Sequence, residues 1–305
     1  MKGAPVRHAL EYAVYLGLKG LLLSLPHGAA RALGRGLGRL AYGLDRRHRQ
    51  VAAKSLRLAF PDWQTERIAA TSRACFAHFG ESFCDAISSL RFDRVESCRR
   101  LSVEGWENLE DAERDGKGVL IMGAHLGDWE AVVKPLALYR GDLHIVGRPA
   151  DNPHLNREMR RLRERFDSKT IDKHNAARPM LRALQANQKV GILIDQRVLP
   201  REGIAVPFFG RLAWTTPVLA KLSLRTGAPI VPTYAFAEPE GRYRVEFHAP
   251  IRATAGGDPE ADEAAVVERL TRLYLEHVEA QIRRCPEQWL WLHDRWKNAP
   301  EATSE

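Results

Sequence analysis

Residues 118–130 read Gly-Val-Leu-Ile-Met-Gly-Ala-His-Leu-Gly-Asp-Trp-Glu, and this stretch decides the fold class. Its apolar run from Val119 to Met122 is typical of a strand that is buried on both faces. Small residues then lead to His125, and the polar residues beyond it predict the start of a helix. A buried strand followed by a helix is the repeating unit of a parallel α/β sheet, in which chemistry gathers at the carboxyl ends of the strands.

The same alternation of strands and helices continues along the chain. Strands are predicted at 118–123, 143–147, 190–194, 229–236 and 243–248, with helices at 128–139, 153–166, 175–187, 215–226 and 258–284. We therefore expect an α/β fold with a mainly parallel sheet flanked by helices. This domain is predicted for residues 61–300, and residues 1–60 are predicted to form a basic, amphipathic, membrane-associating helical segment. No flexible linker separates the two parts, so we expect them to pack together.

The first 60 residues carry the excess positive charge of the protein. They hold eleven Lys or Arg residues and two acidic residues, in a chain of net charge +8. Residues 9–25 are apolar but short for a membrane span and contain two charges. Arg31, Arg35 and Arg39 then recur every four residues among apolar ones, which suits anionic lipid headgroups. The pattern predicts an uncleaved anchor that is interfacial or just spanning, and the alternative is a core helix with a solvated charged face. Because the segment is as apolar as it is charged, nucleic acid is not expected as a partner.

The sequence offers no support for a metal or a cofactor. Its four cysteines are scattered without a CxxC pair, which argues against a zinc site and against a disulfide framework. No GxGxxG follows the first predicted strand, and neither GxxxxGK[ST] nor GxSxG occurs. Dinucleotide, P-loop and serine-hydrolase chemistry therefore lack their motifs.

His125 and Glu130 are the first candidates for catalysis. A histidine at the end of a strand can act as a general base, and a carboxylate on the following helical turn can orient its imidazole. Asp128 is an alternative orienter. The structural alternative is a helix N-terminus at which Asp128 caps the helix and Glu130 interacts with its dipole.

A second polar position follows another apolar run. Asp195 and Gln196 come directly after residues 191–194, so they are expected at the same edge of the sheet as His125, unless the aspartate merely caps a turn. The aromatic stretch 206–210 follows. It is predicted to line an acyl-chain pocket or to enter the bilayer, and it suits ordinary core equally well.

Arginines make a third candidate site. Arg148 ends a strand, and the next predicted helix carries Arg157, Arg160, Arg161, Arg163 and Arg165. Phosphate or an acidic protein would satisfy these side chains through forked hydrogen bonds, and a solvated helix face is the alternative.

With these pieces located, the chain resembles the lipid A biosynthesis lauroyl/myristoyl acyltransferases of Gram-negative bacteria, within the wider lysophospholipid acyltransferase group. The resemblance runs from about residue 8 to 297. The motifs that carry it are residues 125–130, 148–153, 195–196, 206–210, 215–216 and 286–293. Asp128 departs from the family pattern, in which Asn is common at this position.

The resemblance implies an inner-membrane enzyme with its active site on the cytoplasmic side. It would transfer an acyl chain from acyl carrier protein to a hydroxyl of a lipid A precursor, with His125 as general base and Glu130 as its orienter. Arg163 or Arg165 matches a family arginine, and Asp195 matches a family acidic position. Arg148 and Gln196 are expected to bind substrate in the same motifs. Backbone amides near residue 127, or a nearby arginine, would stabilise the oxyanion.

Three other functions remain open from the sequence. The same chemistry would serve an acyltransferase that uses acyl-CoA or acyl carrier protein and acts on another glycolipid or a lysophospholipid. A non-catalytic lipid-binding protein could keep the fold, although intact His125 and Glu130 count against it. A hydrolase would use water in place of the acceptor.

Overall fold

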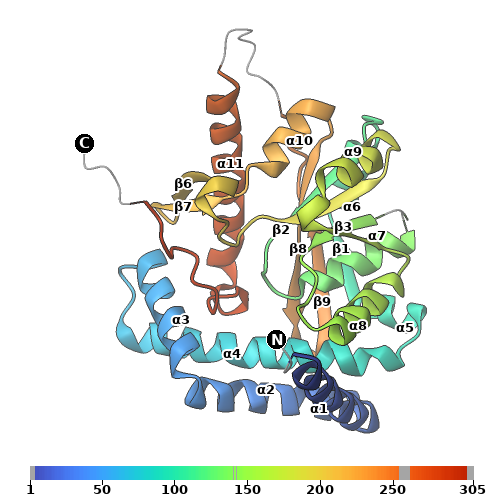
Figure 1. Cartoon of the computed structure of the whole chain (residues 1–305), viewed down its shortest axis with the longest axis vertical. Coiled ribbons are helices and arrows are strands. Elements are labelled where there is room, and N and C mark those ends of the chain that lie inside the picture. The colour runs from blue at the N-terminus through green and yellow to red at the C-terminus, as the bar shows by residue number, and fades with distance from the viewer. Residues whose placement is uncertain (1–3, 140, 142, 254–261, 301–305) are drawn as a thin grey trace.

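The computed structural model describes residues 4–139, 141, 143–253 and 262–300, and its centre is a seven-stranded sheet (Figure 1). The strands are β1 (Leu101–Glu104), β2 (Val119–Gly123), β3 (Leu143–Gly147), β4 (Lys169–Asp172), β5 (Lys189–Leu193), β8 (Ile230–Glu238) and β9 (Arg242–Phe247). They lie in the order β1-β9-β8-β2-β5-β3-β4, and every neighbouring pair is parallel except β8–β9. The predicted mainly parallel sheet is confirmed.

Strand β2 lies inside the sheet, between β8 and β5. All five of its residues are buried, as its apolar run predicts. Because β3, β4, β5 and β8 run in the same direction as β2, the loops that follow these strands open at one edge of the sheet. His125 after β2, Arg148 after β3 and Asp195 after β5 are thereby brought to a common edge.

Helices cover both faces of the sheet. One face packs against α9 (Ala177–Gln185), α10 (Val218–Thr226) and α11 (Glu263–Arg284). The other face packs against α6 (Trp106–Glu113) and α7 (Val133–Tyr139). Helix α8 (Pro153–Glu164) connects β3 to β4, and the short α5 (Arg94–Arg99) precedes β1. Of the helix predicted at 258–284, residues 258–261 lie outside the described part of the chain.

The sequence pattern misses β1, β4 and a separate two-stranded hairpin of β6 (Ile204–Phe208) and β7 (Arg211–Thr215). β1 and β4 are four-residue strands at the two edges of the sheet, and they are too short for an alternation of apolar and polar residues to be recognised in the sequence. The helix expected from residue 215 begins at Val218, because Thr215 is the last residue of β7 and Pro217 is the N-cap of the helix.

In the described part of the chain, four longer helices precede α5 and the sheet: α1 (Ala4–Ser24), α2 (His27–Leu44), α3 (Arg46–Ala59) and α4 (Thr65–Ser88). α2 packs closely along α4, because glycines from both helices meet at their crossing. A Cβ atom on Gly34 would overlap the carbonyl oxygen of Gly80. The basic N-terminal segment is therefore packed against a helix of the part predicted as the α/β domain.

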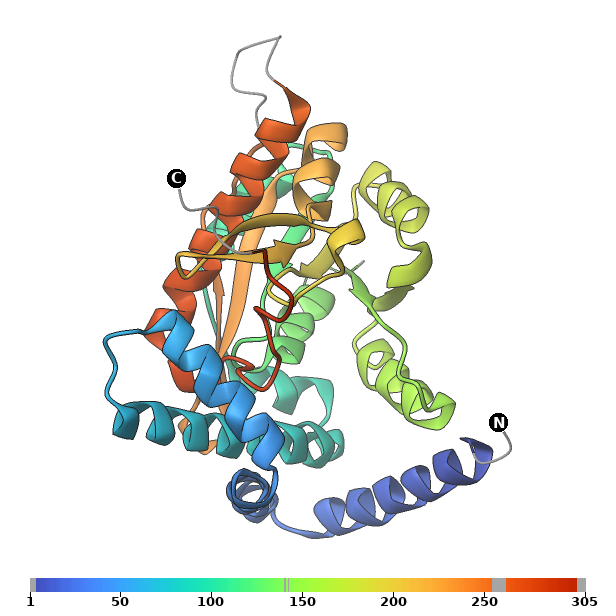
Figure 2. The same ribbon diagram turned by 60° about the vertical axis from the view of Figure 1, so that its left-hand side comes forward.

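Helix α1 extends along the outside of the molecule from α2 toward α8, as Figure 2 shows. It is joined to α8 by an ion pair of 2.6 Å between Lys19 and Glu158, and by the stacked rings of Tyr12 and His154. Across the described residues, no helix combines the length and the apolar character that crossing a membrane requires.

Candidate active site

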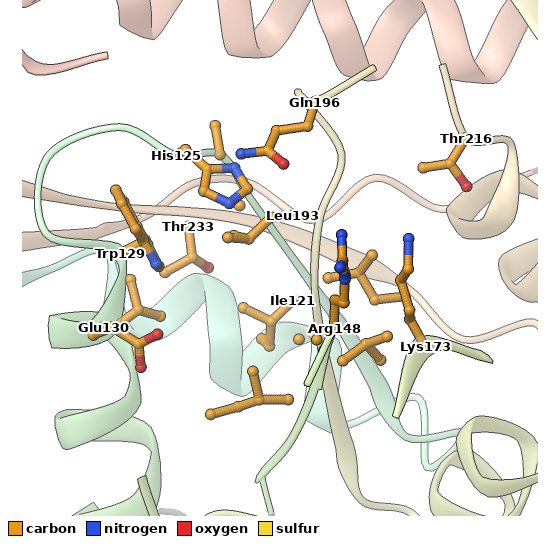
Figure 3. A pocket seen from close by; sticks show the side chains of 18 of the residues that line it. Ile121, His125, Trp129, Glu130, Arg148, Lys173, Leu193, Gln196, Thr216 and Thr233 are labelled. Carbon is orange, nitrogen blue, oxygen red and sulfur yellow. The ribbon is translucent and has the colours of Figure 1, made fainter. Parts of the chain in front are cut away.

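A cavity of about 840 Å³ opens at the carboxyl edge of the sheet. Much of its apolar lining comes from the sheet and from the segment after β2, including Ile121, Val133, Leu136, Leu143, Ile145 and Leu193. Its polar lining includes His125, Glu130, Arg148, Arg163, Lys173, Gln196, Arg197, Glu202, Thr216, Thr233 and His293, part of which Figure 3 shows. The cavity therefore combines an apolar wall with a group of titratable side chains.

His125 is held by Asp195. The Nδ1 atom of His125 lies 2.9 Å from Oδ1 of Asp195, and the backbone N–H of His125 donates to Oδ2 of the same carboxylate at 2.9 Å. Both residues follow neighbouring parallel strands, β2 and β5. Since Nδ1 donates its proton to a carboxylate, Nε2 carries the lone pair and is the atom available to a substrate in the cavity.

The Asp195 carboxylate is enclosed by the protein. Its exposed fraction is 1%, and the indole N–H of Trp289 donates to its Oδ2 at 2.7 Å. Burial acts to raise the pKa of Asp195, but the neighbouring His125 and the hydrogen bonds from His125 and Trp289 outweigh it, and the pKa lies below its ordinary value. Asp195 is therefore a carboxylate at neutral pH and a fixed acceptor for the imidazole.

Glu130 lies elsewhere than the sequence predicts. It belongs to the short 3₁₀ helix η2 (Trp129–Val132), and Arg163 of α8 binds its carboxylate in a fork, with Nε at 3.0 Å and Nη2 at 2.5 Å. The expected contact between Glu130 and His125 is not found in the described residues. Glu130 lines the same cavity as His125, but the orienting contact belongs to Asp195.

Asp128 does not take the orienting role either. Its side chain is not a helix cap, and it lies near Tyr243, Lys134 and Asp85. Burial raises the pKa of Asp128 to about 6, and the positive charge of Lys134 opposes this only partly.

The structure separates the two arginines that the sequence leaves open. Arg163 lines the cavity, whereas Arg165 donates to the backbone oxygens of Ser89 and Phe92, beside the end of α4. Arg165 is thus turned away from the cavity and ties α8 to the N-terminal helices. The exposed pairs that Arg160 and Arg161 form with glutamates of α8 match a solvated helix face.

The aromatic stretch 206–210 is core. Phe208 and Phe209 are 0% and 7% exposed and pack on aromatic rings of the C-terminal segment, namely Trp289, Trp291 and Trp296. None of residues 206–210 lines the cavity. Of the three interpretations of this stretch, ordinary core is the one that the packing supports.

The sequence assigns no role to several cavity residues. The ring of Trp129 meets the ring of His125 edge to face, with 4.9 Å between the ring centres, and His293 accepts from the backbone N–H of Arg197 at 3.1 Å. Lys173 follows β4, a strand that the sequence pattern does not reveal. The one available signal was that a polar residue after each buried strand should meet the others at a shared edge.

Within the described ranges, no three His, Cys, Asp or Glu side chains are grouped so as to hold a metal ion. A parallel sheet that presents a histidine on a buried carboxylate, beside a partly apolar cavity, is an α/β arrangement suited to general-base chemistry on an apolar substrate.

The family model for bacterial lipid A biosynthesis acyltransferases matches residues 1–298, so the chain belongs to that family. It is similar to the lipid A biosynthesis lauroyltransferase of Escherichia coli (strain K12), with 25% identity over 94% of this chain and 91% of that protein. The palmitoleoyltransferase of the same organism is 26% identical over 95% of this chain and 92% of its own length. A phosphatidylinositol mannoside acyltransferase of Mycobacterium tuberculosis (strain ATCC 25618 / H37Rv) is 25% identical over 64% of this chain and 59% of that protein. Family membership makes the protein an acyltransferase and confirms the resemblance found in the sequence.

Proposed function

We propose that the protein transfers a fatty acyl chain from acyl carrier protein to a hydroxyl of a lipid A precursor, with His125 as general base and Asp195 as its positioning residue. The observation that carries the proposal is the 2.9 Å contact between Nδ1 of His125 and the buried carboxylate of Asp195. This contact directs the basic Nε2 atom to a cavity large enough for an acyl chain.

The reaction follows from this arrangement. Nε2 of His125 takes the hydroxyl proton as the acceptor oxygen attacks the thioester carbonyl, and the tetrahedral adduct forms. When the adduct collapses, the carbon–sulfur bond breaks, and the imidazolium returns the proton to the leaving thiol. Asp195 stabilises the imidazolium in between, because it is a carboxylate at neutral pH.

The oxyanion requires donors other than the backbone amides near residue 127. The N–H of Gly127 donates to the carbonyl of Gln288, and that of Asp128 to the carbonyl of Ala235, each at 2.9 Å. The indole N–H of Trp129 has no partner in the described part of the chain, and Figure 3 shows the ring beside His125. We assign the oxyanion contact to this N–H, since a preformed donor in a cavity stabilises developing charge.

In this proposal the role of Glu130 is to hold the Arg163 side chain in place. Arg163 is largely buried, and the bidentate pair with Glu130 compensates its charge and fixes it on the cavity wall. Arg163 is then a further donor, beside the Trp129 N–H, for the oxyanion or for the polar part of a substrate. Arg148 and Gln196 line the cavity too and remain proposed substrate-binding residues.

The reaction is proposed to take place at the cytoplasmic face of the inner membrane. Helix α1 exposes Val6, Leu10 and Val14, each more than 60% exposed and four residues apart, so they form one apolar face. Of the arginines of α2 predicted to meet lipid headgroups, Arg31 is buried against Glu81 and Asp85, and Arg35 pairs with Glu81. The apolar face of α1 is therefore the part proposed to hold the enzyme on a lipid surface. Replacing the three residues by Ser should lower binding to anionic vesicles, and unchanged binding would exclude α1 as the anchor.

A second candidate acceptor is another glycolipid. The relative that acts on phosphatidylinositol mannoside favours it, although its similarity spans 64% of this chain. Both candidates share the base and the thioester donor, so only the acceptor distinguishes them.

The test is a transfer assay with the purified full-length chain in detergent. Lauroyl groups are offered on acyl carrier protein and on coenzyme A, each with a lipid A precursor, a phosphatidylinositol mannoside, a lysophospholipid or no acceptor. Transfer from acyl carrier protein to the lipid A precursor supports the proposal. Preference for another acceptor or for coenzyme A moves the function to that pair, and release of free acid at the same rate without acceptor would make the protein a hydrolase.

A further inference from the structure

Two cations stand side by side at the mouth of the cavity. Strands β3 and β4 are parallel and in register, with Gly147 paired to Asp172. Arg148 and Lys173 each come one residue later, so they follow the ends of two neighbouring strands, whose backbones lie about 5 Å apart across the sheet. Both line the cavity, and Figure 3 shows them on the side away from Trp129 and Glu130.

The acidic groups nearby do not balance this pair. Arg148 meets Asp151 at 2.5 Å in a contact exposed to solvent on both sides, which contributes little. Lys173 has no acidic partner in the described ranges of the chain, and its neighbour Asp172 accepts from the backbone N–H of His174. Of the carboxylates that line the cavity, Glu130 is bound by Arg163, and Glu202 lies near Arg201.

We propose that Arg148 and Lys173 form a phosphate-binding subsite for a substrate of the acyl transfer. A planar guanidinium offers a fork to phosphate oxygens, and a flexible ammonium adds a point charge. A bound dianion or phosphodiester would also remove the repulsion between two like charges that the fold places next to each other.

The subsite lies at a distance from the reacting atoms. β3 is two strands and β4 three strands away from β2, so Arg148 and Lys173 follow strands about 10 and 14 Å from the strand that carries His125. A phosphate held there belongs to a remote part of a substrate and serves to position its reacting end. Two phosphates meet this description: the phosphodiester of the donor's pantetheine arm, and a phosphate on the sugar of the acceptor. The inference rests on the proposed acyl transfer.

The test measures binding of one substrate at a time in a His125→Ala background, so that turnover does not consume the ligand. Lauroyl-coenzyme A is compared with lauroyl-N-acetylcysteamine, a thioester without phosphate. A bisphosphorylated lipid A precursor is compared with the same lipid after phosphatase treatment. The variants are Arg148→Gln, Lys173→Gln and Lys173→Arg, with Arg178→Gln as a control that removes an exposed charge outside the cavity.

We expect the two Gln variants to weaken one phosphate-bearing ligand about tenfold and its phosphate-free counterpart less than twofold. Lys173→Arg should retain binding, and Arg178→Gln should change nothing. An effect on lauroyl-coenzyme A assigns the phosphate to the donor, and an effect on the lipid assigns it to the acceptor. Equal affinity in all variants, equal weakening with and without phosphate, or the same loss in Arg178→Gln overturns the subsite. Because these are binding measurements, a failed transfer assay with the wild-type chain is a separate result.

Discussion

Replacing Asp195 by Asn should abolish most transfer while keeping the shape of the site. Asp195 accepts from three N–H groups: the backbone and Nδ1 of His125, and the indole of Trp289. An Asn has one oxygen, and two of these donors share Oδ2, so the amide nitrogen would face Nδ1. Nδ1 must then accept a hydrogen bond, the proton moves to Nε2, and the base is lost. General-base catalysis contributes 10²–10⁴-fold, so we expect kcat to fall by about 10³-fold, or about 4 kcal/mol.

The assay is steady-state transfer of lauroyl groups to the lipid A precursor, with Asp62→Asn as an exposed control and Glu130→Gln for comparison. KM for both substrates should change less than threefold in Asp195→Asn, since the carboxylate does not line the cavity. A kcat within threefold of wild type would refute the reasoning. A large loss in Glu130→Gln with no loss in Asp195→Asn would return the orienting role to Glu130.

Three further perturbations test other parts of the account. Trp129→Phe keeps a ring against the imidazole but removes the N–H, so kcat should fall by about 10²-fold with KM little changed. The control Trp63→Phe should leave the kinetics unchanged. Equal kinetics for the two variants would exclude the indole N–H of Trp129 as the oxyanion donor. Burial raises the pKa of Asp128 to about 6, so the folded chain keeps a proton that the unfolded chain loses near pH 4, and stability falls as pH rises from about 4 to 6. Asp128→Asn should therefore raise the free energy of unfolding at about pH 7.5 by on the order of 2 kcal/mol and change it little at pH 4; denaturant titrations that show the same change at both pH values would contradict this. Gly34→Ala should lower the free energy of unfolding by more than about 2 kcal/mol, because the new Cβ atom meets the α4 backbone. Gly36→Ala, with open space around it, should raise it by about 0.5–1 kcal/mol. Similar values for the two variants would mean that the stability of the fold does not depend on the close crossing of α2 and α4.

The elements that carry the site were predictable because they are strongly apolar. β2 and β5 are short, mostly buried apolar runs whose ends locate His125 and Asp195, and β3 is a similar apolar run that is only partly buried. That both open on one edge followed from parallel pairing alone. β4 was not predictable, because its four residues mix charged and apolar side chains at the edge of the sheet. Lys173 was therefore missed together with its strand.

The partner of His125 was not readable from spacing. Glu130 is five residues away in sequence and Asp195 seventy, yet the hydrogen bond goes to Asp195, because β2 and β5 are neighbours in the sheet. Likewise, Arg163 and Arg165 are two residues apart on one helix, and only the packing of α8 shows that the first faces the cavity and the second faces α4. Sequence located the pieces of the site, and the strand order decided which of them touch.

The most direct test of the central claim is the rate of lauroyl transfer from acyl carrier protein to the lipid A precursor by His125→Ala, measured beside wild type and beside His174→Ala, an exposed histidine outside the cavity. All three proteins should first show the same cooperative unfolding. We expect transfer by His125→Ala to fall by at least about 10³-fold, while His174→Ala keeps the wild-type rate. A folded His125→Ala that transfers within tenfold of wild type would contradict the assignment of His125 as the base.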